Sequence, residues 1–265
     1  MTMSDIRILV TGACGKMGRE VVKAVTAAGG MAVAAAVDRV CVGEDIGALA
    51  GAGAPGVPVS ADLAEALGRG VDVMVDFTIP AEVMGNLRVA VPRGVAAVVG
   101  TTGLTAANLD ELRAMSARSG SPVFIAPNFA IGAVLMMRFA QQAARYFDYA
   151  EVIELHHEKK LDAPSGTALR TAELMKAAAA GRLTEEAAAE QGEQSRGLPV
   201  GNIRVHAVRL PGLVAGQEVI FGGLGQTLTL RHDTVSRESF MPGVLLAIRK
   251  VRALTGVVVG LESIM

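Results

Sequence analysis

The chain has 265 residues and a formal net charge of −1. This length allows one large or two ordinary domains, and a charge so close to zero gives no electrostatic case for nucleic acid as a partner. No apolar run approaches the roughly 18 residues that span a bilayer, no signal peptide is recognisable, and only two cysteines occur. A cytoplasmic protein in a reducing compartment is therefore expected.

The first predicted strand, residues 6–11, runs directly into a glycine-rich turn with glycines at positions 12, 15 and 18. A helix is predicted over residues 16–28, with Val21, Val22 and Val25 on its apolar face. Such glycines allow a tight turn, close approach of a pyrophosphate to backbone N–H groups and close packing of helix on strand. The spacing is G-x-x-G-x-x-G, so the motif by itself is weak.

A second apolar run, residues 31–37, ends at Asp38, about twenty residues past the glycines, where an acid hydrogen-bonds the adenosine ribose of a dinucleotide. The order of strand, turn, helix, strand and acid favours a dinucleotide site over an ordinary turn with a solvated Asp–Arg pair. Cys14 is expected to fill space in the turn. The residues expected to hold the dinucleotide here are Gly12, Ala13, Cys14, Gly15, Lys16, Met17, Asp38 and Arg39.

Three further strand and helix pairs follow, at 71–77 and 81–91, 95–99 and 106–118, and 122–126 and 131–147. This alternation predicts a Rossmann-like, doubly wound parallel sheet, in which ligands bind outside the carboxyl ends of the strands. The residues at those ends either line a nicotinamide and its ribose or only cap the strands. They are Phe77, Thr78, Gly100, Thr101, Thr102, Ala126, Pro127, Asn128 and Phe129.

After Phe147 the pattern changes to strand-like segments around one helix near 165–180. The segments are 150–156, 202–210, 213–222 and 225–232. Glycines between the later strands resemble meander turns, so a second α+β domain with a mixed, mostly antiparallel sheet is predicted. A polar stretch, 184–196, is expected to be an exposed helix or loop. The predicted domains are 1–128 and 129–235, with a C-terminal helical segment, 236–265, returning to the first.

Two of the four histidines stand side by side, at His156 and His157, near Lys160 and a Ser165-Gly166-Thr167 turn. Successive side chains of a strand point to opposite faces, so the two histidines cannot share one role. An imidazole with an ordinary pKa of about 6.5 suits proton donation at neutral pH. Backbone N–H groups, a hydroxyl and a helix N-terminus suit a carboxylate. The cluster predicts a proton donor beside an anion site.

The neighbouring polar residues are given structural roles. Lys159 is expected to be a solvated charge and Asp162 an acid of the turn before the next helix. His206 and His232 are expected to be ordinary packed histidines.

These motifs together resemble the dihydrodipicolinate reductase family, also called the 4-hydroxy-tetrahydrodipicolinate reductase family. The resemblance runs almost end to end. Its segments are Gly12–Gly18, Asp76–Thr78, Gly100–Gly103, Ala126–Phe129 and, above all, Glu154–Ala168, where an H-H-x-x-K pattern precedes D-A-P-S-G-T-A.

The resemblance implies reduction of 4-hydroxy-tetrahydrodipicolinate, with loss of water, to tetrahydrodipicolinate by NADH or NADPH, in the diaminopimelate route to lysine. It implies His156 as proton donor, Lys160 as the partner of the ring nitrogen, and a homotetramer joined through the second domain. His157, Ser165, Gly166 and Thr167 would bind the substrate, and no metal is implied. Another two-domain dehydrogenase and a non-catalytic dinucleotide sensor are the alternatives.

Overall fold

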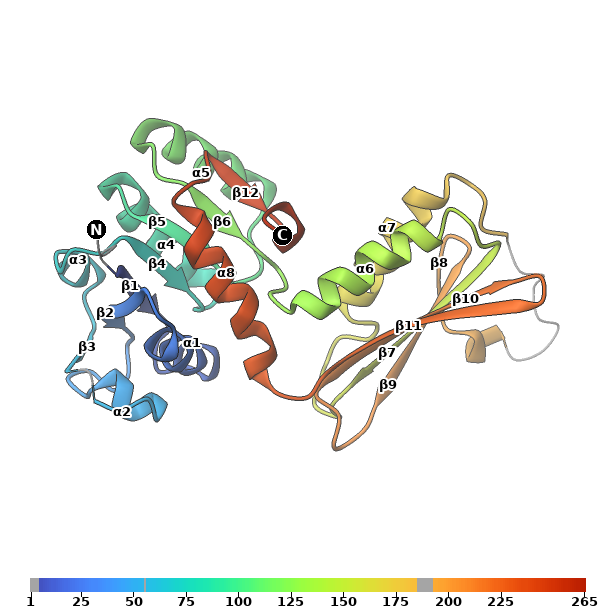
Figure 1. Ribbon diagram of the computed structural model, residues 1–265, viewed down its shortest axis with the longest axis horizontal. Helices are drawn as coiled ribbons and strands as arrows, with labels where there is room; N and C mark the ends of the chain where they lie inside the picture. The colour runs from blue at the N-terminus through green and yellow to red at the C-terminus, as the bar shows by residue number, and fades with distance from the viewer. Residues whose placement is uncertain (1–4, 55, 185–192) are drawn as a thin grey trace. The chain divides into compact units, whose positions relative to one another are not determined.

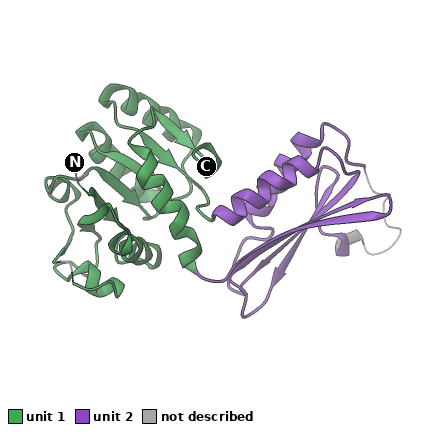
Figure 2. Ribbon diagram, viewed as in Figure 1, with its two compact units in different colours: residues 1–130, 237–265 green, residues 131–236 purple. Residues whose placement is uncertain are grey.

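The computed structural model describes residues 5–54, 56–184 and 193–265, and the chain forms two compact units (Figure 2). The first unit combines Met1–Ala130 with Arg237–Met265, and the second is Ile131–Ser236. The chain therefore leaves the first unit once and returns to it once. The expected boundary after residue 128 lies two residues before the end of this first segment, and the expected boundary after residue 235 lies one residue before the end of the second unit.

The first unit is built on a seven-stranded parallel sheet (Figure 1). In spatial order the strands are β12 (Val257–Val259), β6 (Val123–Ile125), β5 (Ala96–Val99), β4 (Val73–Asp76), β1 (Ile6–Thr11), β2 (Met31–Val37) and β3 (Val59–Ser60). From β1 the chain builds the sheet outward first on one side and later on the other. This reversal opens a crevice at the carboxyl ends of β1 and β4, and it confirms the predicted doubly wound sheet.

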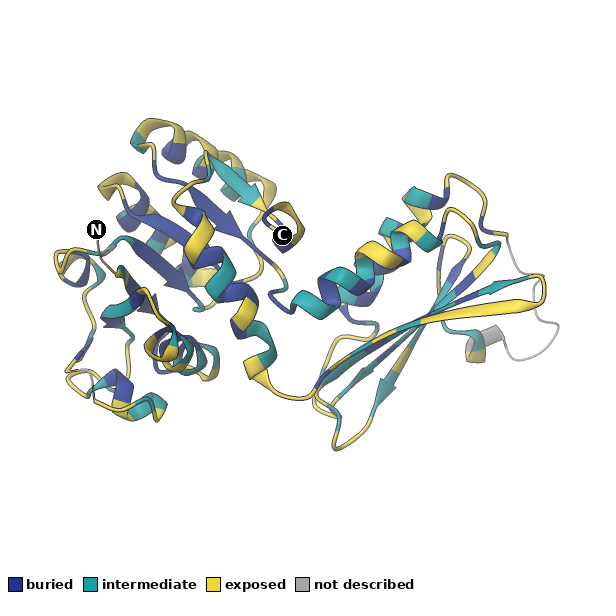
Figure 3. Ribbon diagram, in the orientation of Figure 1, coloured by how far each residue is buried: buried dark blue, intermediate teal, exposed yellow. Residues whose placement is uncertain are grey.

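Helices cover both faces of this sheet. They are α1 (Lys16–Ala27), α2 (Ile46–Ala50), α3 (Leu63–Leu67), α4 (Pro80–Ala90), α5 (Ala106–Ser119) and α8 (Met241–Val251), with short 3-10 turns η1 (Val91–Arg93), η3 (Arg237–Phe240) and η4 (Leu261–Ser263). Helices α1 and α8 pack together, and α4 packs between α3 and α5. The strands between them are buried (Figure 3), which explains their unbroken apolar runs.

Among its described residues, the second unit forms a five-stranded mixed sheet with two α-helices. Its strands, in spatial order, are β11 (Gln226–Thr234), β10 (Ala215–Gly223), β7 (Tyr149–His156), β9 (Ile203–Arg209) and β8 (Leu198–Val200). Only β7 and β9 pair in parallel, so the predicted mixed sheet is confirmed. Helices α6 (Ile131–Ala143) and α7 (Gly166–Ala179) pack against each other and on one face of the sheet, over a core that includes Val152, Met175 and Phe221.

Several short elements escaped the sequence pattern, namely β3, β8, β12, α2 and α3, because two to five residues show no period. The helix expected over 131–147 ends at Ala143. Of the polar stretch 184–196, residues 185–192 lie outside the described residues, and Glu193–Arg196 form a 3-10 turn, η2. Within the described ranges, no helix combines the length and the apolarity that crossing a membrane requires.

Candidate active site

The glycine turn after β1 is shaped by close backbone contacts. Gly12 has φ +69°, and a Cβ on it would lie 2.5 Å from the carbonyl oxygen of Phe77. A Cβ on Gly18 would lie 2.1 Å from the carbonyl oxygen of Gly12. The first glycine therefore makes the turn and the last lets helix α1 pack on it, as in dinucleotide-binding turns.

Helix α1 begins at Lys16 with Gly15 as its N-cap, and no side chain caps it. The first N–H groups of a helix have no acceptor within the helix, so this end can bind an anion such as a pyrophosphate. Cys14 lies in the turn with a buried side chain, and burial is the main reason that its pKa rises to about 12. A thiol that keeps its proton fills space and is a poor nucleophile.

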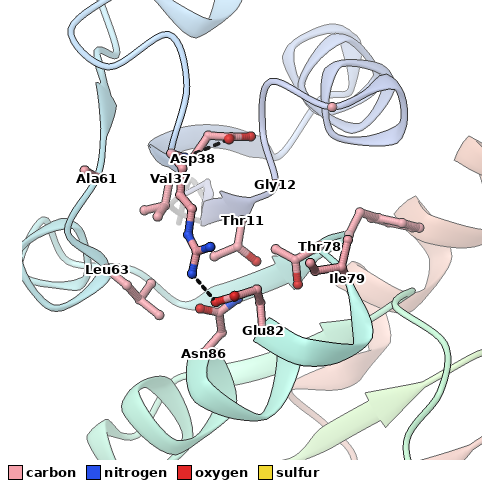
Figure 4. Close-up of a pocket in the computed structure, with 13 residues that line it drawn as sticks. Thr11, Gly12, Val37, Asp38, Ala61, Leu63, Thr78, Ile79, Glu82 and Asn86 are labelled. Carbon is pink, nitrogen blue, oxygen red and sulfur yellow. Dashed lines mark hydrogen bonds and ion pairs between the residues drawn. The ribbon is translucent and has the colours of Figure 1, made fainter.

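A cavity of about 400 Å³ opens beside the turn (Figure 4), which is within the size range of small-molecule sites. Its lining comes from the ends of β1, β2 and β4, from the glycine turn, from the segment that leads from β3 into α3, and from helix α4. The lining residues are Thr11, Gly12, Gly15, Val37, Asp38, Arg39, Ala61, Leu63, Phe77, Thr78, Ile79, Glu82 and Asn86. Six of the residues expected to bind the dinucleotide are thus brought together: Gly12, Gly15, Asp38, Arg39, Phe77 and Thr78.

Charges face each other across this cavity. Asp38 Oδ2 accepts from the backbone N–H of Cys14 at 2.9 Å, and Oδ1 accepts from the N–H of Arg39 at 2.7 Å. The guanidinium of Arg39 pairs with Glu82 Oε2 at 2.7 Å, and both residues line the cavity; Glu82 is labelled in Figure 4. Glu82 was not predicted to belong to the site; in the sequence it is marked only by its place in the first turn of the helix that follows Phe77 and Thr78.

Asp76 at the end of β4 is a second residue that the sequence analysis left out of the site. Its carboxylate is fully buried. It accepts from the hydroxyls of Thr11 (2.7 Å), Thr78 (2.8 Å) and Thr101 (2.6 Å) and from the Asn86 amide (2.8 Å). Asp76 therefore links β1, the segment after β4, helix α4 and the turn after β5 at the edge of the cavity.

The remaining strand-end residues divide by burial. Ala126 and Phe129 are buried, and the Phe129 ring packs 5.8 Å from the ring of Phe77. A Cβ on Gly100 would lie 2.1 Å from the same Phe77 ring. Among the other expected cofactor residues, Ala13 is buried, Met17 and Asn128 are half-buried, and Lys16, Thr102 and Pro127 are exposed. The buried members support the wall of the crevice and the exposed members border it.

The second cluster is built on β7, in the other unit. Glu154 and His156 are two residues apart, so they share one face of the strand. His156 Nδ1 lies 2.5 Å from Glu154 Oε2, and the Glu154 side chain is fully buried. Arg209 stands opposite His156 in the parallel pairing of β7 with β9.

The Arg209 guanidinium donates to both carboxylate oxygens of Glu154, from Nη1 to Oε2 at 2.8 Å and from Nη2 to Oε1 at 2.7 Å. Sequence reasoning missed both residues. Glu154 could have been predicted from the sequence, because its side chain points to the buried face of a strand, where a carboxylate needs a hydrogen-bonded or charged partner. Arg209 could not, because it lies 55 residues further along the chain.

The chain turns directly after His156. The backbone N–H of Lys160 donates to the carbonyl of His157 at 3.1 Å, so strand β7 does not continue past His156. Lys160 instead pairs with both oxygens of Asp162, at 2.7 and 2.9 Å. Asp162, expected only to shape the turn, is thus the partner of Lys160. His157 and Lys159 are exposed.

Helix α7 starts at the Ser-Gly-Thr turn. Ser165 is its N-cap, and its hydroxyl accepts from the N–H of Ala168 at 3.2 Å. The Ser165 N–H donates to Glu154 Oε1 at 2.9 Å. A Cβ on Gly166 would meet no atom within 4 Å, so there is free space beside the first residue of the helix, and the Gly166 N–H helps to lower the pKa of the Asp162 carboxyl. One carboxylate, Glu154, therefore connects the histidine to the expected anion site.

The electrostatics of the cluster depart from the simple expectation for a histidine. The pKa of His156 is lowered, first by burial and then by the nearby charges of Lys160 and Arg209, although Glu154 opposes the shift. Burial raises the pKa of Glu154, but the bonds from Arg209, His156 and Ser165 outweigh burial and hold that pKa below its usual value. Glu154 is therefore an anion and His156 is mainly neutral at pH 7, which corrects the expectation of an unperturbed proton donor.

A parallel sheet with a glycine turn, a helix without a side-chain cap and an acid at the end of the second strand is typical of the class of dinucleotide-binding proteins. Solved structures with low sequence identity share this fold. An amine dehydrogenase from Mycobacterium smegmatis aligns with 98% of this chain and 96% of its own at a TM-score of 0.66 and 17% identity, which shows the fold alone.

Family models place the chain more closely. A model for the dihydrodipicolinate reductase N-terminus matches residues 6–129, and one for the C-terminus matches residues 132–265. A 4-hydroxy-tetrahydrodipicolinate reductase from Moorella thermoacetica is 52% identical over 99% of both chains, and one from Picosynechococcus is 47% identical over 99% of both. A dipicolinate-bound dihydrodipicolinate reductase from Paenisporosarcina sp. TG-14 has a TM-score of 0.86 at 39% identity, covering 98% of this chain and 100% of its own.

The chain belongs to the dihydrodipicolinate reductase family, and it is an NAD(P)H-dependent oxidoreductase.

Proposed function

We propose that this protein reduces 4-hydroxy-tetrahydrodipicolinate, with loss of water, to tetrahydrodipicolinate in the diaminopimelate route to lysine. The observation that carries the proposal is the cluster at the end of β7, where an acid-linked histidine, a lysine and a helix N-terminus belong to one short segment. The dipicolinate-bound relative supports a flat cyclic dicarboxylate as the ligand.

The first unit fits a nicotinamide dinucleotide. Gly12 and Gly15 line the cavity without a side chain, and Gly18 lets helix α1 pack on the turn. The uncapped start of α1 suits the pyrophosphate and Asp38 the adenosine ribose. When bound, the dinucleotide supplies a hydride. Thr101, Thr102, Pro127 and Asn128 would border the nicotinamide end, and Asp76 would keep that edge rigid.

The second unit fits the dicarboxylate. The N-terminus of α7, with the Gly166 N–H and the Thr167 hydroxyl, would bind one carboxylate, because helix N-termini favour anions. Lys160 would approach the ring nitrogen, with Asp162 setting its position, and His157 would contact the substrate from the exposed side of the turn.

Proton delivery would fall to His156. Its Nδ1 is occupied by Glu154, so Nε2 is the ring nitrogen that exchanges a proton with a ligand. A bound dianion would favour the imidazolium, which offsets the lowering of the His156 pKa by burial.

The proposal is tested by assaying the purified protein with substrate generated in situ and following loss of reduced nicotinamide by absorbance. Turnover is expected, and replacing His156 or Lys160 by Ala should lower kcat by about 10² to 10⁴. NADH affinity should be unchanged in both variants. Wild-type protein that binds NADH and gives no turnover would favour a sensor, and near-normal kcat in both variants would reject the proposed chemistry.

A further inference from the structure

A buried Glu–Arg pair lies behind the histidine. Glu154 is wholly buried and satisfies four donors: His156, the Ser165 N–H and two N–H groups of Arg209. Arg209 also donates to the carbonyl of Asp162 at 2.6 Å. A buried carboxylate is costly unless it is paired and hydrogen-bonded, and here every such partner belongs to the strand ends and turn that carry the candidate acid.

We propose that Glu154 and Arg209 are positioning residues for His156: Glu154 keeps a proton on Nδ1, so that Nε2 is the only ring nitrogen able to exchange a proton with the ligand, and Arg209 keeps Glu154 fixed. The inference rests on the proposed function only in that the proton on Nε2 is delivered to the substrate. The tautomer itself is a property of the protein without substrate.

The tautomer follows from the hydrogen-bonding inventory. A carboxylate that carries charge only accepts, so a ring nitrogen 2.5 Å away must donate. Arg209 secures the acceptor role of Glu154, since two charge-assisted bonds in a fixed fork hold both carboxylate oxygens. The same carboxylate holds the Ser165 N–H, so the histidine and the start of α7 keep a set separation.

Three charged groups near the imidazole shift the pKa of His156: Glu154 on β7, Arg209 on β9 and Lys160 in the turn after β7. Only Glu154 favours the imidazolium. Removing its charge should therefore lower the pH at which His156 gains its second proton, whereas removing Arg209 should raise that pH.

The decisive substitution is Glu154→Gln. The amide oxygen can still accept from Ser165, but the amide nitrogen replaces an acceptor beside His156 and favours a proton on Nε2. By the logic of the buried acid in a Ser-His-Asp triad, we expect kcat to fall by about 10² to 10³, with affinity for pyridine-2,6-dicarboxylate within about threefold of wild type. Glu154→Asp keeps the charge and should recover at least about a tenth of the wild-type kcat.

Nitrogen NMR of the four histidines reads the tautomer directly, with each ring assigned by substitution. Wild type should show the proton of His156 on Nδ1, Glu154→Gln should show it on Nε2, and Arg209→Gln should keep it on Nδ1 while the His156 titration midpoint moves to higher pH. Glu151→Gln is the matched control: Glu151 is on the same strand and binds His206 Nε2 at 2.8 Å and Arg196, but it lies on the opposite face.

A wild-type His156 protonated on Nε2, or a His156 tautomer and kcat unchanged by Glu154→Gln, would overturn the inference. If Glu154→Gln does not fold, the Glu154→Asp and Arg209→Gln spectra and titrations decide it. The NMR experiments contain no substrate, so they succeed or fail independently of the assay that tests the proposed reaction.

Discussion

His156 has a lowered pKa because it is buried and faces two cations, and this has a consequence for ligand binding. The protonated fraction falls as pH rises through the lowered pKa, so the protein without ligand holds few imidazolium ions at pH 7. A dianionic ligand should raise that pKa and draw a proton from solution.

Calorimetric titration with pyridine-2,6-dicarboxylate, in buffers of different ionisation enthalpy, should therefore show net proton uptake near pH 7. Uptake should shrink below the lowered pKa, where His156 is already protonated. His156→Gln should abolish it. Binding without proton uptake in the wild type would contradict this account of His156.

Thr167 tests the proposed carboxylate site. Thr167→Val keeps the shape of the side chain and removes a hydroxyl donor. We expect KM for the substrate to rise by the equivalent of about 1.5 to 3 kcal/mol, with little change in kcat. Thr26→Val, which removes a hydroxyl bonded to the carbonyl of Val22 in its own helix, should leave KM unchanged. An unchanged KM in Thr167→Val would place the carboxylate elsewhere.

We expect the Arg39–Glu82 pair to influence the choice between NADH and NADPH. Asp38 favours a ribose hydroxyl and repels a 2′-phosphate, while Arg39 would accept that phosphate if Glu82 did not hold it at 2.7 Å. We expect both cofactors to be used, with NADH equal or modestly preferred. Glu82→Gln should then raise the NADPH-to-NADH ratio of kcat/KM by about three- to tenfold, since the pair is largely exposed.

Isothermal titration with NADPH and NADH should show the same change in relative affinity. Glu111→Gln is the control, because Glu111 pairs with Arg88 at 2.7 Å outside the cavity. A ratio unmoved by Glu82→Gln, or a thousandfold preference in the wild type, would reject this interpretation.

At the scale of elements, the contact between α1 and the glycine turn decides whether the dinucleotide site forms. Gly18→Ala would place a methyl group 2.1 Å from the Gly12 carbonyl oxygen and 2.7 Å from the Cα of Ala13. The helix must then move away from the turn. We expect a loss of about 1 to 3 kcal/mol in the free energy of unfolding and at least about tenfold weaker NADH binding.

Denaturant unfolding and NADH titration measure the two effects of Gly18→Ala. Gly29→Ala is the matched control, since a Cβ there would meet no atom within 4 Å. Equal NADH affinity in Gly18→Ala and Gly29→Ala would show that this packing does not shape the site.

At the scale of the whole molecule, the sheet of the second unit predicts assembly. Helices α6 and α7 cover one face, and across the described parts of the chain no α-helix covers the other, where Ile153 and Ile220 are half-buried. A sheet face with apolar side chains needs a covering layer. We propose that a second copy covers it, consistent with the homotetramer that the family resemblance implies.

Sedimentation velocity at micromolar concentration should therefore show a species of four chains. Ile220→Glu places a second acid beside Glu151, its partner in the β10–β7 pairing, and should yield smaller species. Ile79→Glu, an exposed position in the other unit, should not. A wild-type protein that sediments only as a monomer would refute the proposed assembly.

Much of the architecture follows from local pattern. The short apolar segments at 6–11 and 95–99 have lengths typical of strands, and their alternation with helical periods predicts a parallel sheet in the first domain. The glycines at 12, 15 and 18 mark a turn because their neighbours in sequence form a strand and a helix. The fifteen residues Glu154–Ala168 contain all the predicted catalytic and substrate-binding side chains, so this motif could be recognised from the sequence without the fold.

Tertiary structure decided what depends on distant partners. Arg209 reaches Glu154 only because β9 pairs in parallel with β7, and Asp76 gathers threonines from three strand ends. Glu82 meets Arg39 only across a folded cavity. Hydrogen bonds and burial depend on residues that are far apart in the sequence, so the local spacing of apolar residues does not predict them. The sequence by itself thus predicted which residues bear the chemistry, while the fold determined their partners, and with them the charge of Glu154 and the lowered pKa of His156.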